Sequence, residues 1–393
     1  MSVDSHVSLL RGDVARPSHH SRVPVVRRLL TGCLTSDRSG CIEAIDVLGA
    51  GWLVRQGLAP LIWQKCRTLD LTDEMQSELS TAYYAAAGAA ELRGRELASV
   101  LRVLNEADLP AVVFKGAALA FGVYPDPAFR TMGDLDLWLA AQDMERARLV
   151  LEGRGYQSFC LPGCTPAQML LREGEIGLWN PQPDYGWVEL HWSIYQGEWL
   201  QRAANVGDLS TVRLRTISTQ LGDERAQVLA PEDAIIQSAV HTAVNHQMSM
   251  FALRALIDIA AMARASTVDW SAIVQRSREW RVATAVWLVL SLTVDLAGLM
   301  EAAEAVRQME PSTLRRRIIH SFVNLGMLIE MRNLSLSRWR FVYLLLLIDR
   351  VSDAFRLIGR TLWPETAWLK IRYGQVTAKV RVSHLLGAIW RRI

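Results

Sequence analysis

Two aspartates one residue apart, Asp134 and Asp136, lie within the otherwise apolar segment DLDLWLA. Side chains alternate between the faces of a β-strand, so we expect both carboxylates on one face and Leu135 and Leu137 on the other. Such carboxylates lie within about 7 Å of each other, close enough to bind one divalent cation. Without a cation or a strong arginine partner they would repel each other and lose hydration. The pair therefore predicts a metal site.

A third carboxylate, Glu189, lies in the segment WVELHWSI, where alternation places it on the same face as His191. If this strand neighbours the strand that carries the aspartates, Glu189 completes a cluster of three carboxylates. Such a cluster could hold one or two Mg²⁺ or Mn²⁺ ions for phosphoryl or nucleotidyl transfer. For His191 two interpretations stay open: it orients a substrate or acts as a base near the metal, or it has a structural position at the strand end.

The segment VVFKGAAL predicts a strand, a turn and the start of a helix. Gly116 would let backbone N–H groups approach a phosphate at the helix start, and Lys115 would place a positive charge on it. Arg130, four residues before Asp134, is either a second phosphate ligand or the counter-charge of the carboxylates.

The elements that position these residues form a small core within a largely helical chain. Hydrophobic periodicity predicts strands at 109–115, 134–140 and 187–194, an amphipathic helix at 142–153, and helices on both sides of this core. We therefore predict an α+β fold with a small mixed-sheet core embedded between N-terminal and C-terminal helical regions. The predicted divisions are a flexible N-terminus (1–23), an N-terminal helical region (24–107), the α/β core (108–225), a helical domain (226–310) and a basic helical C-terminal region (311–393).

The composition is that of a globular intracellular protein, because half of the residues are apolar and 21% are charged. The five cysteines indicate reduced thiols, and Cys160 and Cys164 have no second pair at zinc-finger spacing. The N-terminus lacks the apolar core of a signal peptide. The most apolar runs, at 283–294 and 341–348, are too short to span a bilayer and indicate buried helices. We therefore expect a cytoplasmic protein without a transmembrane segment.

The charge is unevenly placed along the chain. From residue 311 to the end there are 15 Lys and Arg residues and only four Asp and Glu residues. Such a region could bind nucleic acid, anionic lipid or an acidic partner, or could form solvated helical faces.

Several further residues have both a functional and a structural interpretation. His241 and His246, five residues apart on a predicted helix, could line a cleft or pack between helices. Asp258 follows Arg254 by four residues, which favours an intrahelical ion pair over a role in the cleft. The tryptophans between residues 179 and 199 could stack a base or pack in the core. The chain contains no recognisable Ser-His-Asp spacing, dinucleotide-binding glycine signature or HExxH motif, so nothing favours a hydrolase or an oxidoreductase.

Five segments resemble, in order and spacing, the bacterial uncharacterised nucleotidyltransferase-like family of the DNA polymerase beta superfamily. They are KGAALA, YPDPAFRTMGDLDLWL, VELHW, LAPEDAIIQSAVHTAVNH and LRALIDIAA, and LWPETAWLKIRYG is similar to the end of such proteins. The resemblance covers roughly residues 48 to 375, and RxxxDxD with its upstream KG is its most specific part. It implies a nucleotidyltransferase core, with Gly116 in the place of the superfamily's glycine-serine turn, Asp134 and Asp136 as metal ligands, and Glu189 as the third carboxylate.

On this resemblance we expect a magnesium-dependent or manganese-dependent enzyme that transfers an NMP group, AMP being favoured, from an NTP to an acceptor with release of pyrophosphate. Lys115, Gly116 and Arg130 would hold phosphates. Glu189 would ligate a second metal ion or activate the acceptor hydroxyl. The acceptor, whether a small molecule, a peptide or protein, or RNA, has no recognisable code in the sequence.

Two alternatives remain open at this stage. One is a catalytically silent, nucleotidyltransferase-like binding protein of a biosynthetic cluster, because Ala117 stands where the superfamily usually has serine or glycine. The other is a toxin-like nucleotidyltransferase that modifies tRNA, for which the basic C-terminal region is the motivation.

Overall fold

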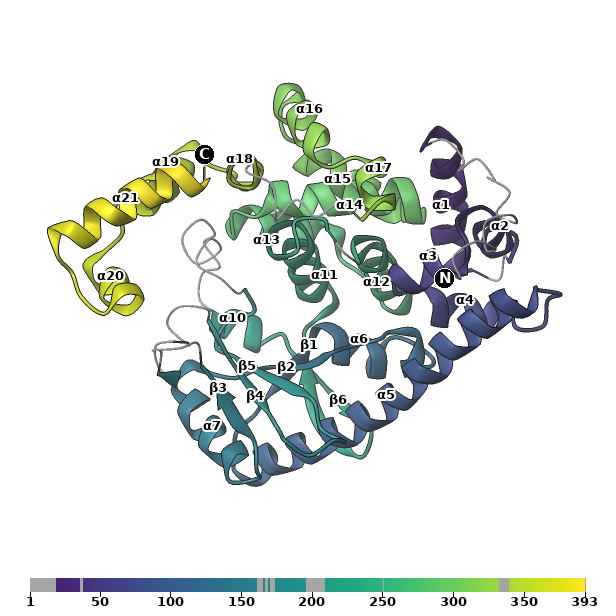
Figure 1. Ribbon diagram of the computed structural model, residues 1–393, viewed down its shortest axis with the longest axis horizontal. Helices are drawn as coiled ribbons and strands as arrows, with labels where there is room; N and C mark the ends of the chain where they lie inside the picture. The colour runs from purple at the N-terminus through teal and green to yellow at the C-terminus, as the bar shows by residue number, and fades with distance from the viewer. Residues whose placement is uncertain are drawn as a thin grey trace, which may run out of the picture.

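The computed structural model describes residues 19–35, 38–160, 165–166, 169, 174–195, 209–249, 251–331 and 339–392. Figure 1 shows a β-sheet in the lower part of the molecule, a group of helices above it, the N-terminal helices at the right and the C-terminal helices at the upper left. The predicted α+β architecture, a mixed-sheet core embedded between helical regions, is confirmed. Three parts of the sequence predictions, the N-terminus up to residue 18, Cys164 and Trp199, lie outside the described residues.

Within the described residues the sheet has seven strands in the order β3-β4-β5-β2-β1-β7-β6. The central strand β2 pairs antiparallel with β1 and parallel with β5. These three strands are the ones that the sequence predicted. The strand bounds are β1 Val112–Phe114, β2 Asp134–Trp138, β3 Gln157–Phe159, β4 Glu175–Trp179, β5 Trp187–His191, β6 Ile217–Leu221 and β7 Glu224–Val228.

Four of the strands were not predicted. The hairpin β6–β7 is largely polar and exposed, so its sequence lacks a clear apolar alternation. Its turn at Gly222, where φ is +62°, was the available signal because glycine adopts this left-handed conformation without strain. The hairpin extends the sheet because β7 pairs parallel with β1.

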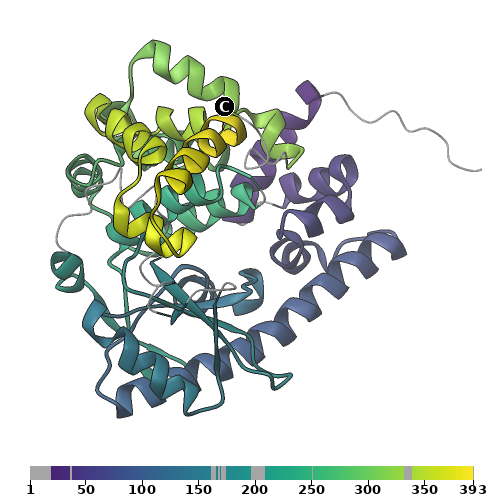
Figure 2. The ribbon, with the colours of Figure 1, turned by 60° about the vertical axis from the view of Figure 1, so that its left-hand side comes forward.

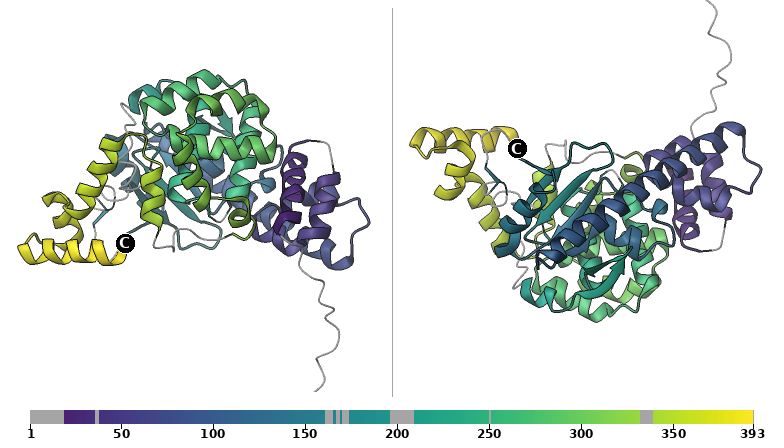
Figure 3. Two further views of the ribbon diagram at one scale, coloured as in Figure 1. Left: turned by 90° about the horizontal axis from the view of Figure 1, so that it is seen from above. Right: turned by 90° about the horizontal axis from the view of Figure 1, so that it is seen from below.

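One long helix, α5 (Asp73–Glu106), covers one face of the sheet, and seen from below it crosses in front of the strands (Figure 3). Its first turn is capped by the Thr72 hydroxyl, which accepts a hydrogen bond from the Met75 amide. Its apolar stripe, which includes Leu97 and Leu101, shares a buried core with Leu135 and Leu137 of β2. The face of β2 opposite its aspartates is thus fixed against α5.

The other helices near the sheet are short. They are α6 (Lys115–Gly122), η1 (Pro127–Phe129), η2 (Ala141–Asp143), α7 (Met144–Glu152) and α10 (Leu209–Arg213). Helix α6 starts directly after β1, as the strand-turn-helix prediction requires, and α7 lies within the predicted helix at 142–153.

The N-terminal helices and the helical domain above the sheet share one hydrophobic core. The N-terminal helices are α1 (His19–Cys33), α2 (Ser39–Leu48), α3 (Ala50–Arg55) and α4 (Ala59–Cys66). The helices of the predicted helical domain are α11 (Pro231–Val240), the π-helical turn η3 (His241–Asn245), α12 (Ala252–Ala265), α13 (Trp270–Glu279), α14 (Ala283–Ala297), η4 (Met300–Ala302) and α15 (Ala303–Met309). The helices α16 (Thr313–Phe322) and α17 (Leu325–Ile329), which follow residue 310, pack into the same core. The Trp52 indole N–H donates to the Ile329 carbonyl at 2.9 Å, which ties the two regions together.

The C-terminal helices are α18 (Arg340–Leu346), α19 (Val351–Leu362), α20 (Thr366–Tyr373) and α21 (Ala378–Arg392). Figure 2, in which the left side of Figure 1 comes forward, shows α20 and α21 close to the viewer. The apolar run at 283–294 lies in α14, most of whose side chains are buried, as predicted. Within the parts of the chain that the structure describes, no helix combines the length and apolarity needed to cross a membrane.

Candidate active site

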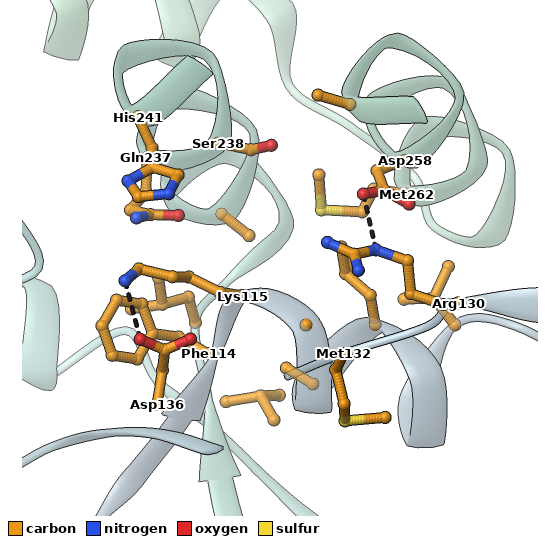
Figure 4. A pocket seen from close by; sticks show the side chains of 18 of the residues that line it. Phe114, Lys115, Arg130, Met132, Asp136, Gln237, Ser238, His241, Asp258 and Met262 are labelled. Atoms are coloured by element: carbon orange, nitrogen blue, oxygen red, sulfur yellow. Dashed lines mark hydrogen bonds and ion pairs between the residues drawn. The ribbon is translucent and has the colours of Figure 1, made fainter. Parts of the chain in front are cut away.

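A cavity of about 610 Å³ lies between the sheet, α6 and the helices α11 and α12. Figure 4 shows Asp136 and Lys115 on the sheet side, Arg130 and Asp258 further along, and His241 facing them from above. The predicted site residues that line the cavity are Lys115, Gly116, Arg130, Asp134, Asp136 and Glu189. His191 is fully buried beside Asp136.

The parallel pairing of β2 with β5 brings the predicted carboxylates together. Asp136 is the register partner of Glu189, and Asp134 is the partner of Trp187. The prediction that the Glu189 strand neighbours the aspartate strand is therefore confirmed. Leu135 and Leu137 lie fully buried, as alternation along β2 requires.

Asp136 is a buried carboxylate with two partners on the same oxygen. Lys115 Nζ lies 2.7 Å and His191 Nε2 lies 2.9 Å from Asp136 Oδ1. Burial alone would raise the pKa of Asp136, but Lys115 and His191 outweigh burial and hold this pKa well below its usual range. Asp136 is therefore a carboxylate anion at any physiological pH.

Asp134 has a different environment, although it lies on the same face of β2. It is half-buried, and burial together with the nearby Asp136 raises its pKa to about 6. Its charge is thus costly unless a cation shares the site.

A fourth carboxylate, Glu175, belongs to the cluster and was missed by sequence analysis. Strand β4 pairs antiparallel with β5, which places Glu175 opposite His191, and its Oε2 lies 3.2 Å from His191 Nδ1. Burial raises the pKa of Glu175 to about 7. His191 favours the charged form of Glu175, but the nearby Glu189 opposes this effect. The available signal was the alternation of Ile176 and Leu178 with polar or small neighbours.

The donor groups fit a divalent cation. Among the described residues, Asp136, Glu189 and His191 each offer a ligand atom, and these atoms lie within 4.8 Å of one another. The two carboxylates suit Mg²⁺ or Mn²⁺, and Asp134 lies two residues from Asp136 on the same face of β2. Of the sequence-predicted metal residues, Asp136 and Glu189 thus belong to this group together with His191, whereas Asp134 does not.

Trp187 holds Glu189 in place, since its indole N–H donates to Glu189 Oε1 at 3.1 Å. Gly177 on the adjacent strand makes room for this indole, because a Cβ there would lie 2.3 Å from the Trp187 ring.

We expect Trp187→Phe to lower Mn²⁺ affinity about tenfold, because Glu189, a predicted metal ligand, loses its orienting hydrogen bond. Isothermal titration calorimetry with Mn²⁺ measures this, and Trp179→Phe on β4 is the matched control. Equal affinities in the wild type and Trp187→Phe would show that the indole has no such role.

Lys115 and Gly116 shape the start of α6. Lys115 adopts a left-handed backbone conformation, with φ of +54°, directly after β1, and its ammonium group points back to Asp136 (Figure 4). Burial opposes the charge of Lys115, but Asp136 and Glu189 outweigh burial and raise its pKa. A Cβ on Gly116 would lie 3.1 Å from Met132 Cβ, so glycine permits close contact between α6 and the Met132 segment.

Arg130 pairs with Asp258 of α12, not with the carboxylates of β2. Arg130 Nε lies 2.7 Å from Asp258 Oδ2, and the Tyr124 hydroxyl donates to Asp258 Oδ1 at 2.8 Å. Lys115 is therefore the counter-charge of Asp136. The expected intrahelical ion pair of Asp258 with Arg254 is replaced by this contact with Arg130.

Arg254 is a second arginine in the cavity that sequence analysis did not assign to the site. Its Nη1 donates to the Thr131 hydroxyl at 2.7 Å, and its guanidinium stacks on Phe251. No carboxylate among the described residues forms an ion pair with it. Burial and Arg130 lower the pKa of Arg254 to about 10, so it remains a cation at neutral pH. On the α12 side of the cavity, Arg130 and Arg254 thus place two positive charges beside one carboxylate, that of Asp258.

His241 and His246 both line the cavity, as one of their two interpretations from the sequence has it. The π-helical turn, closed by the His246 amide on the His241 carbonyl at 3.0 Å, brings residues five apart onto one face. Their rings meet edge to face, with centroids 4.5 Å apart. Desolvation and the nearby Lys115 hold the pKa of His241 well below its usual range, so a neutral imidazole faces the ion pair.

Clustered carboxylates on β2 and β5 of a mixed sheet, together with a lysine and a glycine at the helix start after β1, are typical of nucleotidyltransferase-type proteins. Residues 50–298, more than half of the chain, match the family described as uncharacterised nucleotidyltransferase, and the chain belongs to this family. The match ends well before the predicted limit near residue 375, so the C-terminal helices lie outside it.

The comparison with solved structures found an antigenic nucleotidyltransferase-like protein from Paracoccidioides brasiliensis. It is 14% identical to this chain, with a TM-score of 0.37, over 56% of this chain and 94% of that one. No curated protein sequence matched the chain.

Proposed function

We propose that the chain is a divalent-metal-dependent nucleotidyltransferase that transfers an NMP group from an NTP, with ATP as the leading candidate, to an acceptor hydroxyl. The observation that carries this proposal is that one cavity is lined both by carboxylates and by cationic side chains. The carboxylates are Asp134, Asp136 and Glu189, and the cations are Lys115, Arg130 and Arg254. The carboxylates suit metal ions, and the cations suit a triphosphate. A cytoplasmic location remains a prediction.

In the proposed reaction the acceptor oxygen attacks the α-phosphorus, the bond from this phosphorus to the bridging oxygen of the β-phosphate breaks, and pyrophosphate leaves. Bound metal ions would neutralise charge on the triphosphate and favour ionisation of the acceptor hydroxyl. Asp134, Asp136 and Glu189 would hold them, with His191 beside Asp136. As an alternative to binding metal, Glu189, which lines the cavity, would accept the proton of the acceptor hydroxyl.

The groups that would bind the phosphates in this proposal are Lys115, the amides that follow Gly116, Arg130 and Arg254. Arg130 Nη1 lies 3.8 Å from the position of a Cβ on Gly116, so its guanidinium lies over the start of α6. The Arg130 guanidinium would then supply a charged donor where the superfamily usually supplies a serine hydroxyl, and Arg254 adds a second cation in the same cavity. This arrangement argues against the catalytically silent alternative that Ala117 suggested.

The test is transfer of label from [α-³²P]NTPs, one NTP at a time, in the presence of Mg²⁺ or Mn²⁺, to acceptors from cell extracts or to tRNA. Nucleotide binding is measured in parallel by calorimetry. The proposal requires that the wild type exceed Asp134→Ala/Asp136→Ala in at least one assay. If the two proteins are indistinguishable in both, the binding-protein alternative replaces the enzyme.

Arg254→Gln is expected to weaken Mg²⁺–ATP binding about ten- to hundredfold, since a charged hydrogen bond contributes about 1.5 to 3 kcal/mol. Calorimetry measures this, and Arg264→Gln, an exposed arginine of the same helix, is the matched control. Adenosine, which lacks phosphates, should bind both variants and the wild type alike. A similar loss with adenosine would assign Arg254 to the nucleoside or to the fold.

A further inference from the structure

The C-terminal helical arm, which we define as residues 351–392 with α19, α20 and α21, lies at the edge of the molecule in two different views (Figures 1 and 3). Helices α19 and α21 pack against each other. The arm lies outside the family match, which ends at residue 298, and none of its described residues lines the cavity. Its surface is therefore not explained by nucleotidyl transfer.

Large apolar side chains of the arm are exposed at helical spacing. Val351 and Phe355 lie four residues apart on α19, with 73% and 69% of their surface exposed. Val382 and Leu386 lie four apart on α21, and each is 54% exposed. Residues four apart share one face of a helix, so each helix presents an apolar stripe to its surroundings. Trp363, 60% exposed, follows the end of α19.

The same arm carries a strong positive charge. From Val351 to the end of the chain there are eight Lys and Arg residues and two Asp and Glu residues. Both acidic side chains are already neutralised: Asp353 is buried beside Arg281 at 3.1 Å, and Glu365 lies 2.8 Å from Arg360. Lys370, Arg372 and Lys379 are exposed, so the positive charge faces outward.

We propose that the C-terminal helical arm binds the surface of an anionic lipid membrane, with its apolar stripes in the interface and its basic side chains on the headgroups. Basic amphipathic helices with Phe, Trp and aliphatic residues have this physical character. Trp363, whose ring lies 5.1 Å from the Arg381 guanidinium, combines the aromatic and cationic parts of such a contact. RNA would use the charge but would gain little from exposed valine and leucine, because phosphates and base edges are polar.

Sedimentation of the full-length protein with vesicles tests this surface without nucleotide, so its outcome is independent of the proposed enzyme activity. We expect binding to phosphatidylcholine vesicles that contain phosphatidylglycerol, weaker binding at high salt, and little binding to phosphatidylcholine alone. Equal binding to both vesicle types, or no binding to either, overturns the proposal.

Two double variants separate the apolar and charged contributions. Phe355→Ser/Leu386→Ser and Arg372→Glu/Lys379→Glu are each expected to lower binding to anionic vesicles at least about tenfold. Leu214→Ser, at a residue 86% exposed, and Arg95→Glu, at a side chain 73% exposed, are the matched controls outside the arm. Thermal unfolding confirms that each variant is folded. If the controls outside the arm lose as much binding, the arm is not the lipid-binding surface and the proposal is wrong. If Phe355→Ser/Leu386→Ser binds vesicles normally while Arg372→Glu/Lys379→Glu loses binding to tRNA, the surface is a polyanion site, which also overturns the proposal.

Discussion

Asp136→Asn is expected to abolish metal-dependent nucleotide binding and also to lower the free energy of unfolding by about 3 kcal/mol. The first effect follows because the central carboxylate of the cluster is lost. The second follows because Lys115, whose side chain is only 12% exposed, loses its anionic partner at 2.7 Å. Removing one member of a buried ion pair leaves the other charge uncompensated, which costs about 3 to 5 kcal/mol, and the asparagine amide recovers part of it.

Asp134→Asn separates binding from stability on the same strand. The raised pKa of Asp134 means that its charge is unfavourable in the folded protein without metal, so its removal should leave the unfolding free energy unchanged or higher. Metal-dependent nucleotide binding should nevertheless be lost. Calorimetry with Mg²⁺–ATP and urea unfolding measure the two effects, and Asp223→Asn, in the exposed β6–β7 turn, is the control. Two aspartate variants with the same change in stability would contradict the different environments of the two carboxylates.

Much of this site could be predicted from local patterns. Alternation within DLDLWLA and WVELHWSI fixed the faces of β2 and β5, because apolar neighbours such as Leu135 and Leu190 have to enter the core against α5. That Glu189 lies in the strand beside Asp136 was a hypothesis, and the parallel register confirms it. The aspartates were recognisable because charge inside an apolar strand requires compensation.

The partners of the site could not be predicted in the same way, because they depend on contacts distant in sequence. Asp258 reaches Arg130 across 128 positions, so the helical spacing from Arg254 favoured the wrong ion pair. Glu175 belongs to the cluster only through the antiparallel pairing of β4 with β5. His241 and His246 share a face only because η3 is a π-helical turn, and α-helical spacing does not anticipate this turn.

The cavity is therefore lined by residues of both the sheet and the helices. The sheet side supplies the anions Asp134, Asp136 and Glu189, and α12 supplies Arg254 and the partner of Arg130. A ligand that carries both metal ions and phosphates would therefore contact both regions at once. Nucleotide with Mg²⁺ should accordingly raise the unfolding temperature of the wild type by mass action.

The stabilisation by metal should depend strongly on pH, because metal binding has to displace protons from the cluster. In the metal-free protein the pKa of Asp134 is raised to about 6 and that of Glu175 to about 7, in both cases mainly by burial. A cation in the cluster favours the charged forms of both groups. Below pH 6 both carboxyl groups hold protons, and affinity should fall by up to about tenfold per pH unit for each proton released.

In the metal-free protein, folding stability depends on pH in the opposite direction. A carboxyl group whose pKa is raised on folding contributes stability below its unfolded pKa, and this contribution is lost as pH rises through about 6 for Asp134 and about 7 for Glu175. Mn²⁺ should therefore raise the unfolding temperature much more at pH 8 than at pH 5.5, as differential scanning fluorimetry can measure. In Asp134→Asn one of the two titrating groups is absent, so the pH dependence of any residual Mn²⁺ binding should be less steep. An effect of Mn²⁺ that is the same at both pH values would mean that the cation binds outside this cluster.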